Sequence, residues 1–243
     1  MMPGRGFIVA LSFLTRIPIR HNHEPNVSSA APWFPAVGVV VGAASGLVAF
    51  AMSSASTPFV GAVCGVVTAI VITGAFHEDG LADVADAFVG GWTIDDRLRI
   101  LKDPRHGTYG VVAIGCSIAL RIAALESMSG RDMFLSLIVA HCLARGGAVF
   151  VMLLGSLARQ DGLGADYVKN LPRKGSIASI ALLSIGSAVI LREWALVILP
   201  ITITGALLIR AWSRRKIGGI SGDVLGTVEQ VCEVLILLAL AAR

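Results

Sequence analysis

Long uncharged runs constrain the fold of this chain more than any other feature. The run "VCGVVTAIVITGAF" (63–76) contains no charged residue, and similar runs recur along the 243 residues. A helix needs about 20 apolar residues to cross the hydrocarbon core of a bilayer. The sequence therefore predicts an all-α, polytopic integral membrane bundle of seven spans, with an error of one or two because the fifth and sixth are short. The predicted spans are 33–54, 58–76, 108–128, 133–154, 176–191, 194–209 and 224–242.

The composition supports one membrane-embedded domain over residues 1–243. Charged residues make up only 15% of the chain, against about 25% in soluble domains. The apolar runs follow one another too closely to leave room for a separate soluble domain. Residues 7–14 are too short to span and predict an interfacial or re-entrant segment. Each of the four cysteines lies in a different apolar run, which predicts small buried residues and no disulfide.

Basic residues are distributed unevenly between the two sides that the predicted spans define. Fifteen Lys and Arg residues fall in loops on one side and three on the other. Cytoplasmic loops of membrane proteins carry such an excess, so the first side is predicted to be cytoplasmic. Topology then explains the mildly basic balance of 20 Lys and Arg against 16 Asp and Glu, and no nucleic-acid partner is expected.

The segment "HEDGLADVADAF" (77–88) places acids at the end of an apolar run, on the predicted cytoplasmic side. Asp79, Asp83 and Asp86 have the spacing i, i+4, i+7, which puts them on one helix face. Like charges on one face repel, and Mg²⁺ held by carboxylates and substrate phosphates would offset the repulsion. Gly80 would let a ligand approach closely. His77 is either a hydrogen-bonding or capping residue at the helix end, or a ligand or base of the site. The alternative is a solvated acidic turn, but the interleaved apolar residues favour a site.

Two further segments are predicted to face the same side. In "LKDPRHGTYG" (101–110), Asp103 and Arg105 precede Gly107. Arg suits phosphate because its planar fork donates two parallel hydrogen bonds, and backbone N–H groups at a helix entry also bind phosphate. The alternative is an ordinary basic loop. In "GGISGDVLG" (218–226), Gly222 precedes Asp223, a candidate metal or substrate ligand.

Several ionisable residues fall inside the predicted spans, where charged groups are costly and usually functional. Glu233 is a candidate for an inner polar site, and Glu229 is a second one. Arg121, His141 and Arg145 could pair with these acids or contact substrate. Together the residues predict phosphoryl or phosphodiester transfer with Mg²⁺ at a membrane surface.

These motifs together resemble the cobalamin synthase family, the adenosylcobinamide-GDP ribazoletransferases. "FLTRIP" (13–18), "FHEDGLADVADAF" (76–88), "LKDPRHGTYG" and "GGISGDVLG" stand in the family's order and cover nearly the whole chain. Glu233 matches an acid that follows the last motif. Glu78 and Ala87 depart from residues that are common in the family, but no core acid is lost.

The resemblance implies an enzyme of the cell (inner) membrane that makes adenosylcobalamin and needs Mg²⁺. A hydroxyl of α-ribazole or of its 5′-phosphate would attack adenosylcobinamide-GDP, and GMP would leave. Asp79, Asp83 and Asp86 would hold one or two Mg²⁺, and Asp83 or Asp86 could also act as base. Asp223 would complete the metal shell or orient the ribazole hydroxyl. Arg105 would hold the GMP phosphate. The other substrate contacts expected are His77, Gly80, Asp103, Gly107, Gly222 and Glu233. Association with a second copy or with other cobalamin-assembly enzymes is also compatible with the resemblance.

Two other functions compete with that of a cobalamin synthase. A CDP-alcohol phosphotransferase also uses a membrane-embedded acidic cluster, but its pattern has Arg where this chain has Asp83 after Ala82. A cation or vitamin transporter would use Glu229, Glu233, Arg121 and Arg145 as a pathway. It would release no GMP and would tolerate the loss of Asp79.

Overall fold

The computed structural model describes residues 3–19, 27–155, 157–158, 168 and 170–243, and within them the named elements are all helices, with one isolated bridge between Leu157 and Ile220. Three of the basic residues assigned to the cytoplasmic side, Arg20, Arg159 and Lys169, lie outside the described residues. The elements are α1 (Pro3–Leu14), η1 (Val27–Trp33), α2 (Phe34–Ala55), α3 (Pro58–Thr73), α4 (Phe76–Ala85), η2 (Asp86–Gly90), α5 (Ile94–Ile100), α6 (Thr108–Glu126), α7 (Gly130–Leu153), α9 (Arg173–Leu191), η3 (Arg192–Trp194), α10 (Ala195–Ile217) and α11 (Gly222–Ala241).

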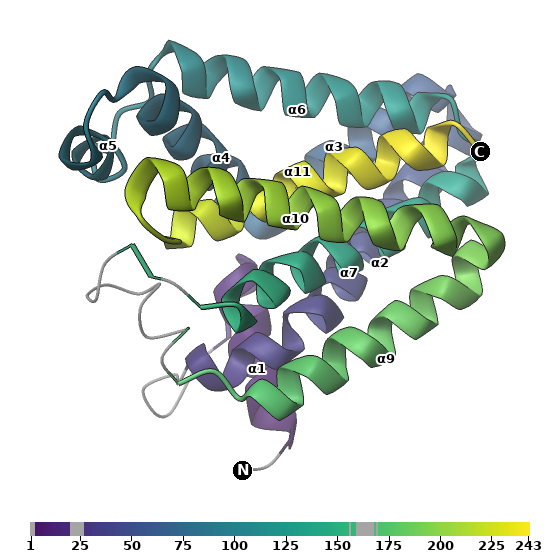
Figure 1. Cartoon of the computed structure of the whole chain (residues 1–243). Coiled ribbons are helices and arrows are strands. Elements are labelled where there is room, and N and C mark those ends of the chain that lie inside the picture. Colours follow the sequence, from purple (N-terminus) through teal and green to yellow (C-terminus); the bar gives the residue numbers. More distant parts are fainter. Residues whose placement is uncertain (1–2, 20–26, 156, 159–167, 169) are drawn as a thin grey trace.

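The long helices form a membrane bundle. Helices α6, α10 and α11 run in nearly the same direction, and α1 lies across them (Figure 1). Among the described residues, five helical segments are long and apolar enough to cross a membrane, and six if α3 and α4 count as one bent span. One of the five, Arg173–Ile217, contains both α9 and α10, which turn back on each other at η3. The count agrees with seven within its error, and α1 is the expected short apolar helix.

Small residues bring α2 and α7 into close contact. A Cβ atom added to Gly46 would lie 2.9 Å from the carbonyl oxygen of Phe134, and one added to Gly38 or Gly42 would collide with the α7 backbone. Helices pack in lipid mainly through such van der Waals contact, which small residues permit. The spacing of glycines in α2 therefore builds the core of the bundle.

A sharp break separates α3 from α4. Gly74 and Ala75 both adopt the left-handed conformation, with φ of 67° and 59°, and the chain bends by 90°. The predicted span 58–76 is therefore too long, because α3 ends at Thr73. After the break, α4 begins among buried residues and carries its acids outward. Interrupted helices of this kind often build sites in membrane proteins.

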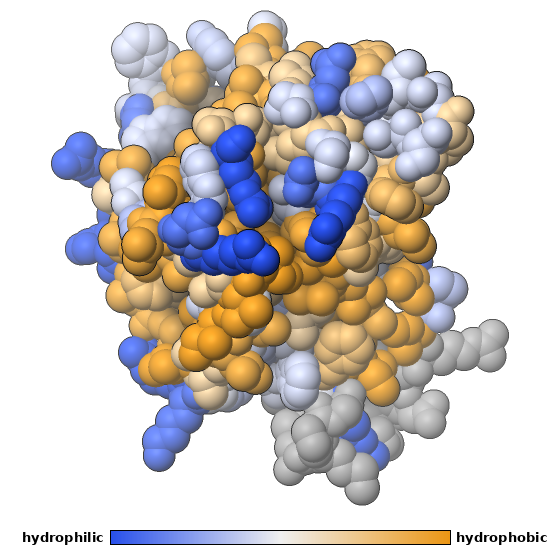
Figure 2. All heavy atoms as spheres, turned by 90° about the vertical axis from the view of Figure 1, so that its right-hand side faces the viewer, coloured by the Kyte–Doolittle hydropathy of each residue, from blue (hydrophilic) through white to orange (hydrophobic). Residues whose placement is uncertain are grey.

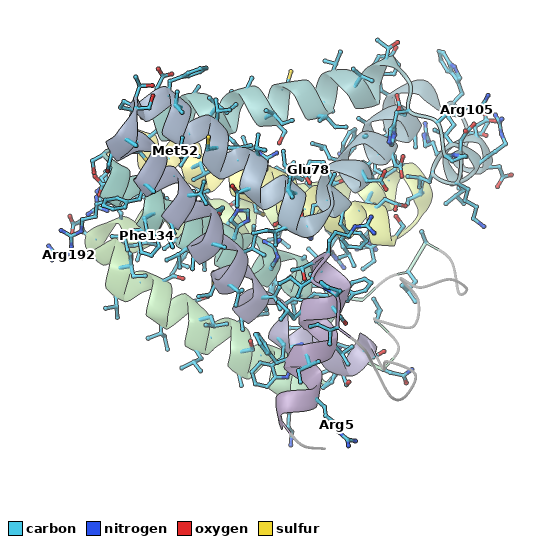
Figure 3. The ribbon with its side chains drawn as sticks, turned by 180° about the vertical axis from the view of Figure 1, so that it is seen from behind. Arg5, Met52, Glu78, Arg105, Phe134 and Arg192 are labelled. Atoms are coloured by element: carbon cyan, nitrogen blue, oxygen red, sulfur yellow. The ribbon has the colours of Figure 1, made fainter. Side chains whose placement is uncertain are left out.

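The two ends of the bundle differ in their charged residues. Arg105 lies at one end, Arg192 at the opposite end and Glu78 between them (Figure 3). The end seen in Figure 2, which is the right-hand side of Figure 1, shows a limited group of hydrophilic side chains within a largely hydrophobic surface. The other end carries α5, the loop before α6 and the first turn of α11. We call it the acidic end, because Asp79, Asp83 and Asp223 lie there.

Candidate functional site

Close packing of α4 against α11 places two of the sequence motifs side by side. A Cβ atom on Gly80 would lie 2.9 Å from the carbonyl oxygen of Asp223. The Thr227 hydroxyl donates to the carbonyl oxygen of Gly80 at 3.0 Å. The close approach expected at Gly80 is thus made by the α11 backbone and not by a ligand. Its consequence is that Asp223 stands next to the acids of α4.

Asp79 and Asp83 face the outside of α4 together with a histidine from the loop before α6. The His106 ring lies between them, with Nε2 3.4 Å from Oδ1 of Asp79 and Nδ1 3.4 Å from Oδ1 of Asp83. Asp79 is 61% exposed and Asp83 15%. One ligand atom from each of these three residues could contact a single metal ion. Asp223 lies beside them, because its backbone packs against Gly80 of α4, and together these residues form the surface acid site.

Asp86 does not share this arrangement. Its carboxylate accepts hydrogen bonds from the backbone N–H of Gly107 at 2.6 Å and of Gly110 at 2.9 Å. It is buried, and it begins the π-turn η2. Of the three aspartates predicted to share one helix face as a site, only Asp79 and Asp83 therefore do so. Both oxygens of the third fix the entry to α6, where unpaired N–H groups need acceptors.

The Asp103–Arg105 pair lies on the exposed loop at the acidic end. Arg105 donates from Nε and Nη2 to the two carboxylate oxygens of Asp103, each at 2.9 Å. These hydrogen bonds lower the pKa of Asp103 to about 2, so the pair stays charged at any physiological pH. Arg105, which is expected to bind phosphate, is therefore exposed at the surface, but its guanidinium group is hydrogen-bonded to Asp103.

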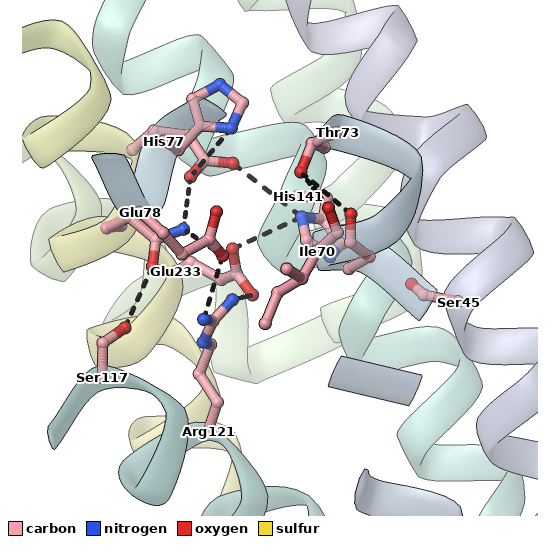
Figure 4. Close-up of polar contacts among 12 residues, drawn as sticks. Ser45, Ile70, Thr73, His77, Glu78, Ser117, Arg121, His141 and Glu233 are labelled. Carbon is pink, nitrogen blue, oxygen red and sulfur yellow. Dashed lines mark hydrogen bonds and ion pairs between the residues drawn. The ribbon is translucent and has the colours of Figure 1, made fainter. Parts of the chain in front are cut away.

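A second group of charged residues lies deep between α4, α6, α7 and α11, and we call it the buried cluster (Figure 4). Arg121 donates to Glu78 at 3.0 Å and to Glu233 at 3.2 Å. Arg145 lies 2.6 Å from Glu229. The remaining members are His77, His141, Ser117 and Gln230. The expected pairing of Arg121 and Arg145 with the α11 acids is therefore confirmed.

The buried cluster has unused hydrogen-bonding capacity. Glu78 Oε2, Arg121 Nε, His141 Nε2 and two nitrogens of Arg145 are buried without a hydrogen-bond partner. A cavity of about 50 Å³, lined by Arg145, Glu229, His77 and apolar side chains, adjoins it. A water molecule needs roughly 10–15 Å³ by this measure, so the cavity has room for a few waters beside Arg145, the one of these groups that lines it.

The structure separates the predicted site residues into two sets. It brings Asp79, Asp83 and Asp223 together at the acidic end. It places His77 and Glu233 in the buried cluster, away from that surface. Sequence reasoning missed His106, although the residue stands within the second motif. It also missed Glu78, whose partner Arg121 is 43 positions away, a separation that no local pattern reveals.

Comparisons with known proteins agree with the motifs. The sequence model of the family described as "Cobalamin-5-phosphate synthase" matches residues 6–241. Three similar proteins are each described as "Adenosylcobinamide-GDP ribazoletransferase". The one from Bradyrhizobium diazoefficiens is 39% identical over 96% of this chain and 92% of its own. The one from Ralstonia nicotianae is 33% identical over 98% and 95%, and the one from Shewanella piezotolerans is 32% identical over 96% and 93%. No solved structure matches the chain.

Proposed function

The chain belongs to the cobalamin-5-phosphate synthase family of enzymes of cobalamin biosynthesis, and we propose that it is an adenosylcobinamide-GDP ribazoletransferase. In this reaction a hydroxyl of α-ribazole, or of its 5′-phosphate, forms a bond to the cobinamide-linked phosphorus of adenosylcobinamide-GDP. The bond from that phosphorus to the GMP oxygen breaks. The products are adenosylcobalamin, or its 5′-phosphate, and GMP, with release of the hydroxyl proton.

One observation carries this proposal beyond the family match. Three aspartates from two motifs, 144 positions apart at the extremes, converge at one end of a membrane bundle. Phosphoryl-transfer sites depend mainly on positioning and on stabilisation of charge. Asp79, Asp83 and Asp223 supply a negative centre that can hold a metal, and basic residues of the same end can hold phosphates.

The donor set fits Mg²⁺, which takes oxygen ligands and usually combines a few carboxylates with substrate phosphates. Asp79, Asp83 and Asp223 would hold it. Bound there, it would neutralise charge on the diphosphate and polarise the phosphorus. His106 stands between two of these carboxylates and offers a ring nitrogen as a further ligand.

The other residues receive roles from their positions. We assign Asp86 to the placement of the loop that carries Asp103, Arg105 and Gly107 towards substrate. Arg105 would bind the GMP phosphate by replacing its hydrogen bonds to Asp103 with hydrogen bonds to the phosphate. Gly222, which is exposed at the start of α11, leaves space beside Asp223.

His77 and Glu233 hold α4 and α11 together from within in this proposal, and they do not touch substrate. The hydroxyl that attacks would give its proton to Asp83, the least exposed acid of α4 that still faces the site.

The site is proposed to face the cytoplasm of the inner membrane, because its loop with Lys102 and Arg105 belongs to the side on which the sequence predicts the excess of Lys and Arg. Adenosylcobinamide-GDP and α-ribazole, or its 5′-phosphate, would then reach it from the cytoplasm, while the spans contact lipid. Association with a second copy or with other enzymes of the pathway would take place within this membrane.

The test is turnover by purified protein in liposomes. Adenosylcobinamide-GDP is supplied with α-ribazole or its 5′-phosphate, in Mg²⁺ or in EDTA, and products are identified by mass spectrometry. We expect GMP and a matching cobalamin in equal amounts, only with Mg²⁺. GMP without cobalamin, or no reaction by folded protein, would contradict the proposal.

A further inference from the structure

A basic side chain outside the motifs gathers three backbone carbonyls near the surface acid site. Arg97, in α5, donates from Nε to the carbonyl oxygen of Gly91 at 3.2 Å and from Nη2 to that of Trp92 at 3.0 Å. Its Nη1 donates to the carbonyl oxygen of Lys216, at the end of α10, at 3.0 Å. All the acceptors are main-chain groups, so Arg97 serves to hold backbone in place.

Lys216 returns the contact from the other side. Its Nζ donates to the carbonyl oxygen of Phe88 at 2.8 Å, across 128 positions of sequence. Next to this bond the Phe88 ring meets Trp212 edge to face, with centroids 5.0 Å apart. Phe88 is 1% exposed, so the contact is closed to water on that side. We call the reciprocal bonds of these two residues the Arg97–Lys216 clamp.

The clamp joins the two segments that carry the surface acids. On one side is the π-turn η2 (Asp86–Gly90), which begins three residues after Asp83. On the other side the chain leaves α10 through Gly218, with φ of 79°, and reaches Asp223 five residues later. Carbonyls at the ends of helices have no partner within the helix. Here Arg97 and Lys216 supply the donors, and they supply them across the gap between the segments.

We propose that Arg97 and Lys216 are positioning residues: in addition to the direct packing of α4 on α11, they fix the spacing between Asp83 and Asp223, and with it the ability of the surface acid site to hold a divalent cation. The inference rests on the proposed function, because it takes these aspartates as the metal ligands. Neither residue needs to touch substrate or metal.

Loss of the Lys216 side chain would change the affinity for a cation in opposite directions, depending on whether Lys216 acts through its charge or by positioning the acids. Lys216→Met removes a positive charge near the acids, and Coulomb attraction alone would then make a cation bind more tightly. If the clamp positions the acids, the same change separates them and the cation binds more weakly. Metal affinity in the absence of substrate therefore distinguishes the two.

The experiment measures Mn²⁺ binding to purified protein in detergent by electron paramagnetic resonance, because carboxylate sites that suit Mg²⁺ also take Mn²⁺. We expect Lys216→Met to raise the dissociation constant by about tenfold, as loss of about one charged hydrogen bond would. Lys216→Arg, which keeps a donor, should restore most of the affinity. Lys174→Met, which removes an exposed lysine at the start of α9, is the matched control and should not change it.

Each outcome decides a separate point. Wild-type binding with unchanged or tighter binding by Lys216→Met would overturn the clamp and leave the proposed function standing. No Mn²⁺ binding by the wild type would contradict both. If Lys216→Met does not fold, Arg97→Lys takes its place, since lysine keeps the charge but lacks the three-way fork. The same loss of affinity is expected.

Discussion

At the residue scale, the buried cluster contains three carboxylates and two guanidinium groups, and both Glu78 and Glu233 share Arg121. Burying an unpaired charge is far more costly than burying a hydrogen-bonded pair. The acids and the bases of the cluster are therefore not equivalent, although all are buried. Glu233 and Arg121 already form a pair of opposite charges, and Glu78 adds a second carboxylate to that pair.

Replacement of Glu78 and of Arg121 should consequently differ. Glu78→Gln keeps an oxygen acceptor for Arg121 and removes the excess negative charge, so we expect unchanged or slightly higher stability. Arg121→Gln leaves two carboxylates facing each other and should cost about 3–5 kcal/mol. Thermal unfolding in detergent, followed by fluorescence, measures both. Equal destabilisation by the two variants would show that charge balance does not govern the cluster.

Asp86 offers a second residue-scale prediction, because the structure gives it a purpose other than metal binding. Asp86→Asn retains one acceptor oxygen, and its amide would face a backbone N–H. Hydrogen exchange of the peptide covering residues 103–112 should rise about tenfold or more, since bonds to a charged acceptor contribute about 1.5–3 kcal/mol. Asp132→Asn, which changes an exposed aspartate in the first turn of α7, is the control and should leave that peptide protected. Unchanged exchange in Asp86→Asn would contradict its role as the anchor of the loop.

At the element scale, the break between α3 and α4 decides where the site is built. Ala75 has φ of 59°, a conformation that costs an L-residue roughly 1–2 kcal/mol. We expect Ala75→Gly to unfold at the same or a higher temperature than the wild type, and Ala75→Val at a clearly lower one. Circular dichroism melts in detergent check this order. A valine variant as stable as the wild type would show that the left-handed turn is not required.

The elements themselves were largely predictable. The lengths of apolar runs are a local property matched to the bilayer, so the predicted spans 33–54 and 108–128 lie within two residues of α2 and α6. The end of α3 was missed because "TGAF" continues the apolar run, and hydropathy does not register a left-handed turn. The i, i+4, i+7 argument placed Asp79 and Asp83 correctly. It failed at Asp86, whose carboxylate accepts hydrogen bonds from the backbone N–H groups of Gly107 and Gly110 in a segment that spacing within α4 does not reveal.

Contacts between distant segments account for the rest of the site that the sequence did not reveal. His106 belongs to a motif, yet nothing in the spacing of "LKDPRHGTYG" directs its ring between Asp79 and Asp83. The same holds for the pairs of Arg121 and for the Arg97–Lys216 clamp. The periodicity of the sequence predicts which residues share one face of a helix. Which residues then contact each other across helices depends on how α4, α6 and α11 pack.

At the scale of the whole molecule, the two ends of the bundle should face opposite sides of the membrane. A variant lacking the four native cysteines can carry a single new one at Ser127, in the turn after α6, or at Lys102, near the site. In intact cells, a membrane-impermeant maleimide should label the cysteine at 127 and leave the one at 102 unlabelled until the membrane is opened. The reverse pattern would place the acidic end outside the cytoplasm.

If the surface acids perform the transfer from adenosylcobinamide-GDP, the loss of one of them should stop GMP release, and Asp83→Asn is the direct test. The variant is compared with the wild type and with Lys174→Met in liposomes, with Mg²⁺, adenosylcobinamide-GDP and α-ribazole. We expect the variant to remain folded in the membrane and to lose at least about a thousandfold in rate, as when a metal site that stabilises transition-state charge is removed. Near-normal GMP release by Asp83→Asn would contradict the account, because the reaction would then proceed without the site described.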